Sequence, residues 1–272
     1  MADPTPVFDD LRDESEDLDR LVAGAGDERW ELSTPAPGWS VAHQIAHLAW
    51  TDRSALLAVT DPDLFHARAR EALAAPDSFV DRGAEEGAAL PPGELLARWR
   101  EGRAALDAAL RAAAPGARFP WYGPSMSAAS VATGRLMETW AHGQDVADAL
   151  GVARPPTDRL RHVVRIGVRT RDFAFGVRGL PVPGEEFRVE VVAPSGALWA
   201  YGPEDAAQRV TGPALDFCLL VTQRAHRTDL AVRAEGPDAD RWLDVAQAFA
   251  GAPGAGRAPR TATEGAPGGG AR

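Results

Sequence analysis

The sequence predicts a helical bundle at residues 1–153, followed by a small α+β domain at residues 154–256. Long segments with apolar residues at helical spacing fill the first part. The segment ARPPTD at 153–158 interrupts them, and strand-like and helix-like segments are mixed beyond it. The last segment, residues 257–272, is rich in Gly, Ala, Pro and Arg without periodicity, and we expect it to be disordered.

In the first part, Ser40 is a candidate N-cap for a helix at 41–59. Gly151 is a candidate end for a helix that begins near Ser127. The other predicted helices span residues 6–25, 64–75 and 94–114, with a shorter one after Asp77. Four long helices with short connections are typical of a four-helix bundle.

In the second part, residues 158–175 are predicted to form a helix. The segment FRVEVVAPSGALWAYG at 187–202 contains two strand-like runs around Pro-Ser-Gly, which indicates a hairpin. Further predicted elements are a buried helix at 213–223, a strand at 230–234 and a closing helix at 240–249.

Composition excludes several classes of protein. A net charge of -10 argues against nucleic acid or an anionic membrane surface as the main partner. No apolar run reaches the length of a membrane span, and the acidic N-terminus lacks the features of a signal peptide, so we expect a cytoplasmic protein. All 29 basic residues are arginine, which excludes a Schiff-base or P-loop lysine.

The segment LMETWAHGQD at 136–145 places three polar residues on one face of a mostly apolar helix. Glu138, His142 and Asp145 lie at i, i+4 and i+7, within about 60° of one another at helical spacing. A carboxylate and an imidazole are costly to bury without a partner. A divalent metal would provide one, whereas an ordinary helix-surface pair is the alternative.

The predicted helix at 41–59 carries a second pair, His43 and His47, one turn apart. One histidine of this helix, together with Glu138 and His142, would supply the three protein ligands typical of a catalytic zinc site with one open position. Neutral imidazole and carboxylate also suit iron, nickel or manganese, so the residues do not name the metal. Asp52 lies among apolar positions of the same helix, and Arg135, another arginine or a buried group to be capped are its candidate partners.

Four further features have open interpretations. Asp145 either orients a metal ligand without binding the metal itself, or forms a salt bridge. Arg224 and His226 either face an acidic substrate or stabilise the end of their helix. Cys218, the only cysteine, lies among large apolar residues and is interpreted as a buried, inert thiol. The loop residues Trp121 and Tyr122 either line a pocket or hold the loop.

Two segments, TPAPGWSVAHQIAHLA at 34–49 and METWAHGQDVADALG at 137–151, resemble the mycothiol-dependent maleylpyruvate isomerase family. That family belongs to the DinB-like superfamily of metal-binding four-helix bundles. The stretches APSGALWAYGPEDA, GPALDFCLLVTQR and WLDVAQAFAGAPGAGR are similar to one uncharacterised actinobacterial subfamily of it. The resemblance covers nearly the whole chain, to about Arg257, and the arginine-rich composition fits such a host.

The resemblance implies His47, Glu138 and His142 as metal ligands and places the family's following aspartate at Asp145. His43 stands where relatives more often have aspartate, so it is a possible fourth ligand or an altered support for the others. In the isomerase, the thiol cofactor mycothiol adds to an unsaturated diacid and allows cis–trans rotation. Other relatives transfer the thiol to electrophiles.

These observations lead to three hypotheses. The first is a metal-dependent isomerase or thiol transferase, with Asp145 and Arg224 as catalytic residues and a small electrophilic or carboxylate substrate bound between the two domains. The second keeps the metal, as a Lewis acid, in a thiol-independent isomerase, cyclase or hydrolase of a specialised-metabolite pathway. The third is a non-catalytic module that binds metal or a small molecule. The expected metal is zinc, mycothiol is a candidate cofactor, and monomer and homodimer both remain open.

Overall fold

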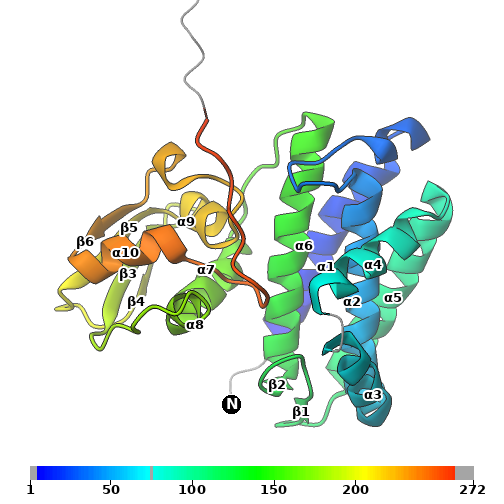
Figure 1. Ribbon diagram of the computed structural model, residues 1–272, viewed down its shortest axis with the longest axis horizontal. Helices are drawn as coiled ribbons and strands as arrows, with labels where there is room; N and C mark the ends of the chain where they lie inside the picture. The colour runs from blue at the N-terminus through cyan, green and yellow to red at the C-terminus, as the bar shows by residue number, and fades with distance from the viewer. Residues whose placement is uncertain (1–4, 74–75, 261–272) are drawn as a thin grey trace, which may run out of the picture.

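The computed structural model describes residues 5–73 and 76–260, where a helical part is followed by a part with a four-stranded sheet (Figure 1). The helix-rich class predicted for the first part and the sheet predicted for the second are therefore confirmed. The domain boundaries and the assignment of the helices to a DinB-like four-helix bundle stay predictions.

Helices dominate the first part because its apolar residues recur at helical spacing. The elements are α1 (Thr5–Ala23), the short 3-10 helix η1 (Asp27–Glu31), α2 (Val41–Thr60), α3 (Pro62–Leu73), α4 (Pro76–Ala88), α5 (Pro92–Ala112), a small ribbon of β1 (Arg118–Phe119) and β2 (Met126–Ser127), and α6 (Ala128–Leu150). The end of the helix predicted at 64–75 falls outside the described residues. No described helix is both long and apolar enough to cross a membrane.

The long helix α6 has the boundaries that its sequence predicts. The Ser127 hydroxyl accepts a hydrogen bond from the backbone N–H of Ser130 at 3.2 Å and so caps the first turn. Gly151 ends the helix with φ of 68°, a left-handed conformation that glycine adopts without a steric penalty. The position of every side chain on α6 is thus set at both ends.

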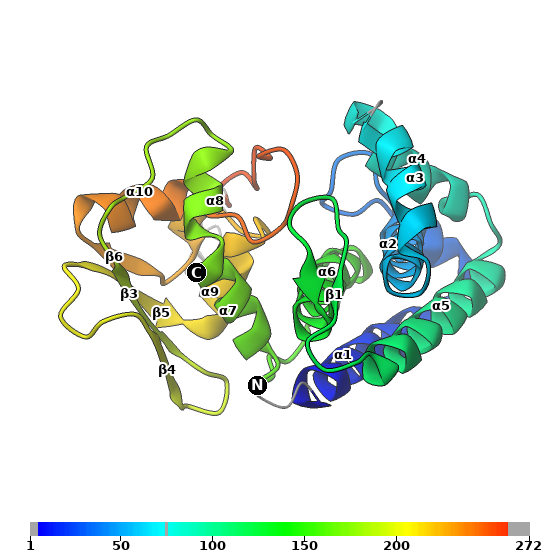
Figure 2. The same cartoon turned by 90° about the horizontal axis from the view of Figure 1, so that it is seen from below.

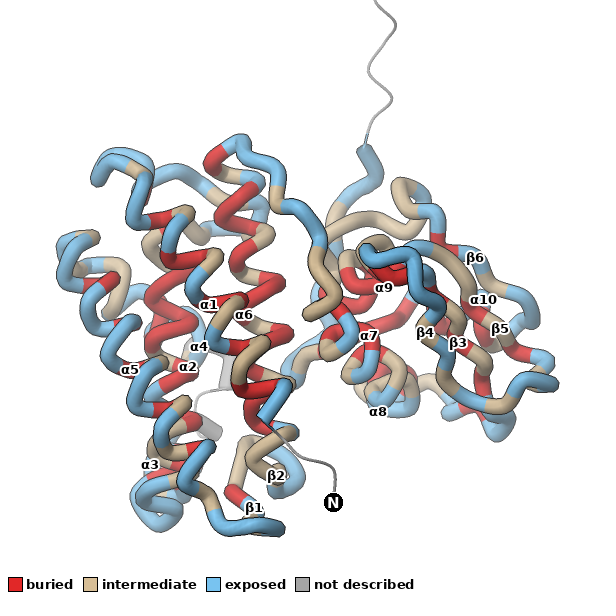
Figure 3. The backbone as a smooth tube through the Cα atoms, turned by 180° about the vertical axis from the view of Figure 1, so that it is seen from behind, coloured by how far each residue is buried: buried red, intermediate tan, exposed pale blue. Residues whose placement is uncertain are grey.

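Helix α6 lies between two cores. It packs against α1, α2 and α5 on one side and α7 on the other, and Figure 3 shows buried positions along most of its length. One core joins α6 and α1 to the C-terminal part, through residues such as Phe8, Leu136 and Val163. The other joins α2, α5 and the end of α6 around Trp99. Both parts of the molecule therefore pack against helix α6.

The C-terminal part places helices beside a mixed sheet with strand order β4-β3-β5-β6 (Figure 2). Its elements are α7 (Leu160–Arg169), α8 (Arg171–Gly176), β3 (Phe187–Val192), β4 (Leu198–Tyr201), β5 (Gln208–Pro213), α9 (Ala214–Val221), η2 (Arg227–Asp229), β6 (Arg233–Glu235) and α10 (Pro237–Val245). Strands β3 and β4 form the predicted hairpin, and β5 runs parallel to β3 with Val210 opposite Val189.

Four predictions for this part need correction. The closing helix predicted at 240–249 is α10, which begins three residues earlier and ends four residues earlier. The helix predicted at 158–175 is two helices separated at Thr170, whose hydroxyl donates to the carbonyl of Ile166 at 3.0 Å. The strand predicted at 230–234 is β6, which begins three residues later and ends one residue later. Strand β5 was not predicted, because one of its two inward residues is Gln208, whose side-chain oxygen accepts from two backbone N–H groups of α10.

Ion pairs join the two parts at the segment that follows α6. Glu14 on α1 is 2% exposed and forms salt bridges with Arg154 and with Arg159, whose Nε lies 2.8 Å from the carboxylate. A buried carboxylate needs such partners to offset its lost hydration. Because the arginines come from the connection and the start of the second part, the pairs hold that connection against the bundle.

The C-terminal segment returns to the bundle instead of leaving the molecule at residue 257. Residues 257–260 of the predicted disordered tail are described, and Arg257 forms a salt bridge with the buried Asp145 of α6. The contact contradicts the disorder expected from residue 257. The buried carboxylate of Asp145 provides a partner for Arg257, and composition alone does not reveal such a partner. The remainder of the predicted tail, 261–272, lies outside the described residues.

Asp52 of α2 meets Arg135 of α6 inside the bundle, as one of the interpretations of the sequence proposed. The Nε of Arg135 lies 2.8 Å from Asp52, whose second oxygen accepts from the Trp99 indole at 3.2 Å. Both charged residues are at least 96% buried, since Asp52 is 4% and Arg135 is 3% exposed. Their pairing fixes the lateral position of α2 against α6.

We expect Asp52→Ala to destabilise the protein by about 3–5 kcal/mol, because it leaves the guanidinium of Arg135 buried without a counter-charge. Urea denaturation measures this change. Asp9→Ala is the matched control: Asp9 also pairs with arginine, but its side chain is 44% exposed, so its loss should cost less than about 1 kcal/mol. Equal effects of the two substitutions would contradict the role assigned to the buried pair.

Candidate metal centre

Helices α2 and α6 bring together three side chains that could hold a metal ion: His47, Glu138 and His142. One ligand atom of each lies within 4.8 Å of the other two. The Oε2 atom of Glu138 is 3.1 Å from Nε2 of His142 and 3.5 Å from Nε2 of His47. Within the described part of the chain this is the group of three or more His, Cys, Asp and Glu residues that could hold a metal ion.

The local geometry follows from helix spacing. Glu138 and His142 are one turn apart on α6 and therefore point the same way. His47 faces them from α2, while Ile45 and Leu48 on the same helix are fully buried in the bundle core. Packing of that apolar face leaves the polar face of α2 directed toward α6. The three side chains converge because both helices have their registers fixed by buried neighbours.

The distances fit a small divalent ion. Metal–ligand bonds of about 2.0–2.2 Å in a tetrahedron place the ligand atoms roughly 3.3–3.6 Å apart. The separations of 3.1 and 3.5 Å from Glu138 are close to that range without rearrangement of the backbone. Two imidazoles and one carboxylate form a ligand set that suits zinc and also iron, nickel or manganese. Three protein ligands leave an open position for substrate or cofactor.

The protonation states of the site favour metal binding. Burial and the nearby His47 lower the pKa of His142 to about 4, so this imidazole is neutral at pH 7. Burial by itself raises the pKa of Glu138, but the adjacent imidazoles of His142 and His47 outweigh it and hold the pKa well below the usual value. A neutral imidazole and an ionised carboxylate are the forms that coordinate a metal.

A buried glutamine orients one of the two histidines. Gln44 is fully buried, and its Oε1 lies 2.5 Å from Nδ1 of His142. Its amide group donates to the Thr34 hydroxyl at 2.8 Å. Since the amide oxygen accepts, His142 donates from Nδ1, and Nε2, the nitrogen nearer Glu138, would be the atom that binds a metal. Gln44 was not predicted as part of the site. Its polar side chain, three positions before His47 on the same helix, was the signal in the sequence that could have indicated it.

His47 lacks an equivalent support. Its Nδ1 is buried and has no hydrogen-bond partner among the described residues. The ring is instead positioned by aromatic neighbours, with Trp39 at 5.3 Å and Trp50 at 6.0 Å between ring centroids. Trp39 also stacks on His142 at 5.9 Å, and its indole donates to Asp81 of α4. Two tryptophans therefore shield the histidines from water, which strengthens electrostatic interactions at the site.

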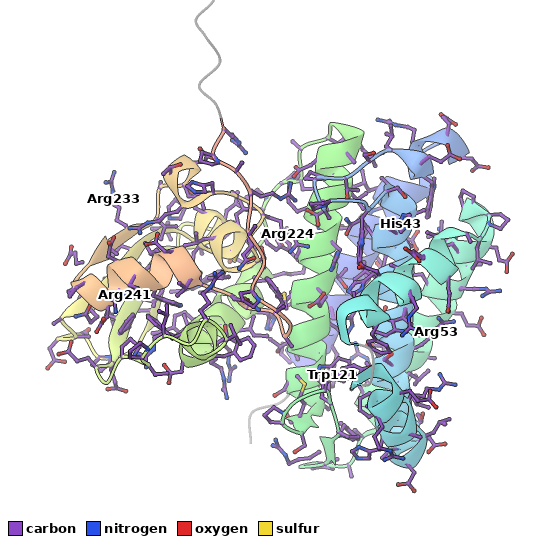
Figure 4. All side chains as sticks on the ribbon, in the orientation of Figure 1. His43, Arg53, Trp121, Arg224, Arg233 and Arg241 are labelled. Carbon is purple, nitrogen blue, oxygen red and sulfur yellow. The ribbon has the colours of Figure 1, made fainter. Side chains whose placement is uncertain are left out.

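His43, the predicted candidate for a fourth ligand, is not part of this cluster. Its Nδ1 lies 2.8 Å from the hydroxyl of Ser40 and accepts from the Ser40 backbone N–H at 3.3 Å. These contacts form a capping box at the start of α2. Figure 4 places His43 on α2, beyond α6 as seen from the C-terminal part. The structure thus assigns His43 to the helix terminus.

Asp145 and Arg224 come together in a salt bridge, which is one of the two interpretations proposed for Asp145. Asp145 is 1% exposed, and among the described residues its carboxylate accepts hydrogen bonds from two arginines and from neither histidine of the cluster. Nη2 of Arg224, just beyond the end of α9, lies 2.9 Å from Asp145, and Figure 4 places Arg224 where the C-terminal part faces α6. The positive charge of Arg224 also lowers the pKa of His142. Arg224 therefore acts electrostatically on the cluster.

The remaining candidates have structural surroundings. Cys218 is buried, and burial raises the pKa of its thiol well above the usual value, which agrees with the predicted inert thiol. His226 accepts the backbone N–H of Thr228 and caps η2. Trp121 and Tyr122 pack on Phe65, with ring centroids 5.9 and 5.3 Å away, and hold the loop before α6.

Comparisons with known proteins identify relatives of both parts. The family model described as mycothiol maleylpyruvate isomerase N-terminal domain matches residues 11–147, which include His47, Glu138 and His142. A model described as wyosine base formation matches residues 183–233 of the C-terminal part. Two uncharacterised proteins of Mycobacterium tuberculosis, from strains CDC 1551 and H37Rv, are each 59% identical over 257 residues, which is 94% of this chain and 100% of theirs.

Solved structures agree with this relationship at the level of the fold. Crystal structures of the mycothiol-dependent maleylpyruvate isomerase and of a mutant of it match with TM-scores of 0.60 and 0.59. Each match covers 87% of this chain and 96% of the isomerase, at 17% and 16% identity. The matched isomerase N-terminal domain spans half of the sequence, and so this chain belongs to the mycothiol maleylpyruvate isomerase family.

Proposed function

We propose that this protein is a metal-dependent enzyme of the mycothiol-dependent maleylpyruvate isomerase type. It would use a thiol cofactor to isomerise a small unsaturated carboxylate or to transfer the thiol to a small electrophile. The observation that carries this proposal is the convergence of His47, Glu138 and His142, with Glu138 ionised and His142 neutral. Membership of the isomerase family supplies the reaction type.

Each residue of the cluster has a role in this proposal. His47, Glu138 and His142 would hold the metal, with zinc as the expected ion, and Gln44 would keep His142 in the coordinating tautomer. A divalent ion bound there would lower the pKa of a bound thiol or polarise a carbonyl oxygen. Trp39 and Trp50 would limit the access of water to the open position.

The chain offers no thiol of its own for this chemistry. Its only cysteine, Cys218, is fully buried in the C-terminal core, and its Sγ lies 3.7 Å from the backbone carbonyl of Leu160. A sulfur nucleophile must therefore come from a cofactor. The sulfur would add to an unsaturated substrate and leave again after rotation, or stay attached when the substrate is an electrophile that loses a leaving group.

Arg224 is the proposed contact for the carboxylate of the substrate. Its two Nη atoms hydrogen-bond to the Thr222 carbonyl at 2.7 Å and Asp145 at 2.9 Å. Its Nε is buried and has no partner among the described residues. A buried, unsatisfied donor on a guanidinium suits a carboxylate, which accepts charge-assisted hydrogen bonds. Asp145 would then act by positioning Arg224.

The metal site is tested by metal analysis. We expect His47→Ala and Glu138→Ala to lose the bound metal while the protein stays folded, because each removes one of three ligands at a site that the bundle core does not depend on. Elemental analysis of the purified variants, together with circular dichroism, measures both properties. His43→Ala should keep the metal, and full metal retention in Glu138→Ala would contradict the site.

The thiol-dependent reaction is tested by turnover. The zinc-loaded protein should consume maleylpyruvate or a chlorobimane-type electrophile only when mycothiol is added, because the chain has no accessible thiol. Product formation is followed by chromatography, with the metal-free Glu138→Ala variant as control. Turnover without any thiol would favour Lewis-acid catalysis instead. Absence of turnover with the metal in place would contradict the thiol-dependent function.

Arg224→Gln should lower kcat/KM for a carboxylate substrate by roughly 10- to 100-fold, because a hydrogen bond to a charged group contributes about 1.5–3 kcal/mol. Steady-state kinetics measure the change, and most of it should appear in KM. Arg227→Gln is the matched control, since Arg227 pairs with Asp240 and Asp244 at the surface. An unchanged kcat/KM in Arg224→Gln would exclude Arg224 as the anchor.

A further inference from the structure

The C-terminal segment, residues 246–260, is attached at several points as it passes between the two parts (Figure 1). The backbone N–H of Ala248 donates to the Val221 carbonyl at 2.7 Å. Gln247 is 1% exposed and bonds the carbonyls of Phe249 and Gly251 with its side chain. Near the end, the backbone N–H of Arg260 donates to Asp229 at 2.9 Å. These hydrogen bonds therefore hold the segment in place on the rest of the molecule.

Between these attachments, Arg257 reaches the same carboxylate as Arg224. Arg257 bonds Oδ1 of Asp145 and Arg224 bonds Oδ2, so two guanidinium groups share one carboxylate. The side chain of Arg257 is 22% and that of Arg224 is 14% exposed. Burial lowers the pKa of Arg257, and Asp145 opposes this effect. Asp148, which also faces Arg257, is exposed and therefore screened by water.

The second arginine is more than Asp145 needs. One guanidinium can bind both oxygens of a carboxylate in a bidentate manner. Burying a second cation beside the first costs desolvation and repulsion unless a further anion is present. The group of Arg224, Arg257 and Asp145 carries a local charge of one positive unit in a protein whose net charge is -10. Such a pair has donors left for one more anionic ligand.

The free donors are on both arginines. Nε of Arg224 has no partner among the described residues, and for Arg257 the hydrogen bond that the structure gives is from Nη2 to Asp145. A guanidinium carries five N–H donors. We propose that Arg257 is a specificity-determining residue, which together with Arg224 binds a carboxylate of the substrate and selects dicarboxylates over monocarboxylates. This inference rests on the proposed function, because it concerns the substrate of that site.

The test is equilibrium binding of maleate and acetate to the full-length, zinc-loaded protein by isothermal titration calorimetry. Maleate carries one carboxylate for the open position of the metal and one for the arginine pair, whereas acetate carries a single one. We expect Arg257→Gln to weaken maleate binding about tenfold, as loss of a charge-assisted hydrogen bond predicts. Acetate affinity should change less than about twofold in the same variant, within the spread of unrelated surface substitutions.

Two more variants make the result specific. Arg260→Gln removes the same charge from the same segment, where the structure gives only a backbone hydrogen bond, and it should bind maleate like the wild type. Arg257→Lys keeps the charge but loses the forked geometry, so its affinity for maleate should lie between those of wild type and Arg257→Gln. This variant carries the test if glutamine at 257 lowers the melting temperature.

Unchanged maleate affinity in both Arg257 variants would overturn the inference. Equal weakening of maleate and acetate would also overturn it, as would the absence of saturable maleate binding to the wild type. The measurement involves no thiol and no turnover. A protein that selects maleate through Arg257 but shows no thiol-dependent reaction would contradict only the proposed function, and the opposite result would contradict only this inference.

Discussion

Burial of charge along α6 is the constraint on which the arrangement of this molecule depends. The helix is covered on both sides, yet it carries Arg135, Glu138, His142 and Asp145 at largely buried positions. Each group must find a counter-charge or a metal, because an unpaired charge in the interior costs several kcal/mol. Arg135 meets Asp52 on α2, while Asp145 draws arginines from the C-terminal part. Pairing along one helix thereby sets the relative position of the bundle, α9 and the C-terminal segment.

The candidate metal site lies among these buried charged residues of α6. On the α2 side, Glu138 and His142 face His47. The two histidines keep the carboxylate ionised, whereas burial and the nearby His47 keep His142 neutral. One turn further along α6, Asp145 holds Arg224 and Arg257 at the junction with the C-terminal part. Figure 4 shows Arg224 at this junction. A ligand-set of carboxylate and imidazoles beside a pair of guanidiniums suits anionic substrates, although the chain as a whole is acidic.

The relatives identify the family of the protein, but they do not identify its reaction. The proteins that share 59% identity are themselves uncharacterised, and the solved isomerase structures are similar in fold at 16% and 17% identity. A fold can host different reactions, so the function is inferred from the residues of the candidate site. Near the three residues of the cluster, Gln44 bonds Nδ1 of His142 and Trp39 stacks on its ring, while Arg257 is bound to Asp145 on the same helix.

The amino-acid sequence by itself determined what depends on neighbours in the chain. Apolar spacing and caps located α2, α5 and α6, and one-turn spacing placed Glu138 and His142 on one face. Only the tertiary structure decided which partners meet. Strand β5 needed pairing with β3 to be recognised, His43 was taken by the cap at Ser40, and Arg257 was drawn from a segment of low complexity to Asp145. The physical reason is that spacing along a helix is local, whereas the partner of a buried charge is chosen by packing between distant segments.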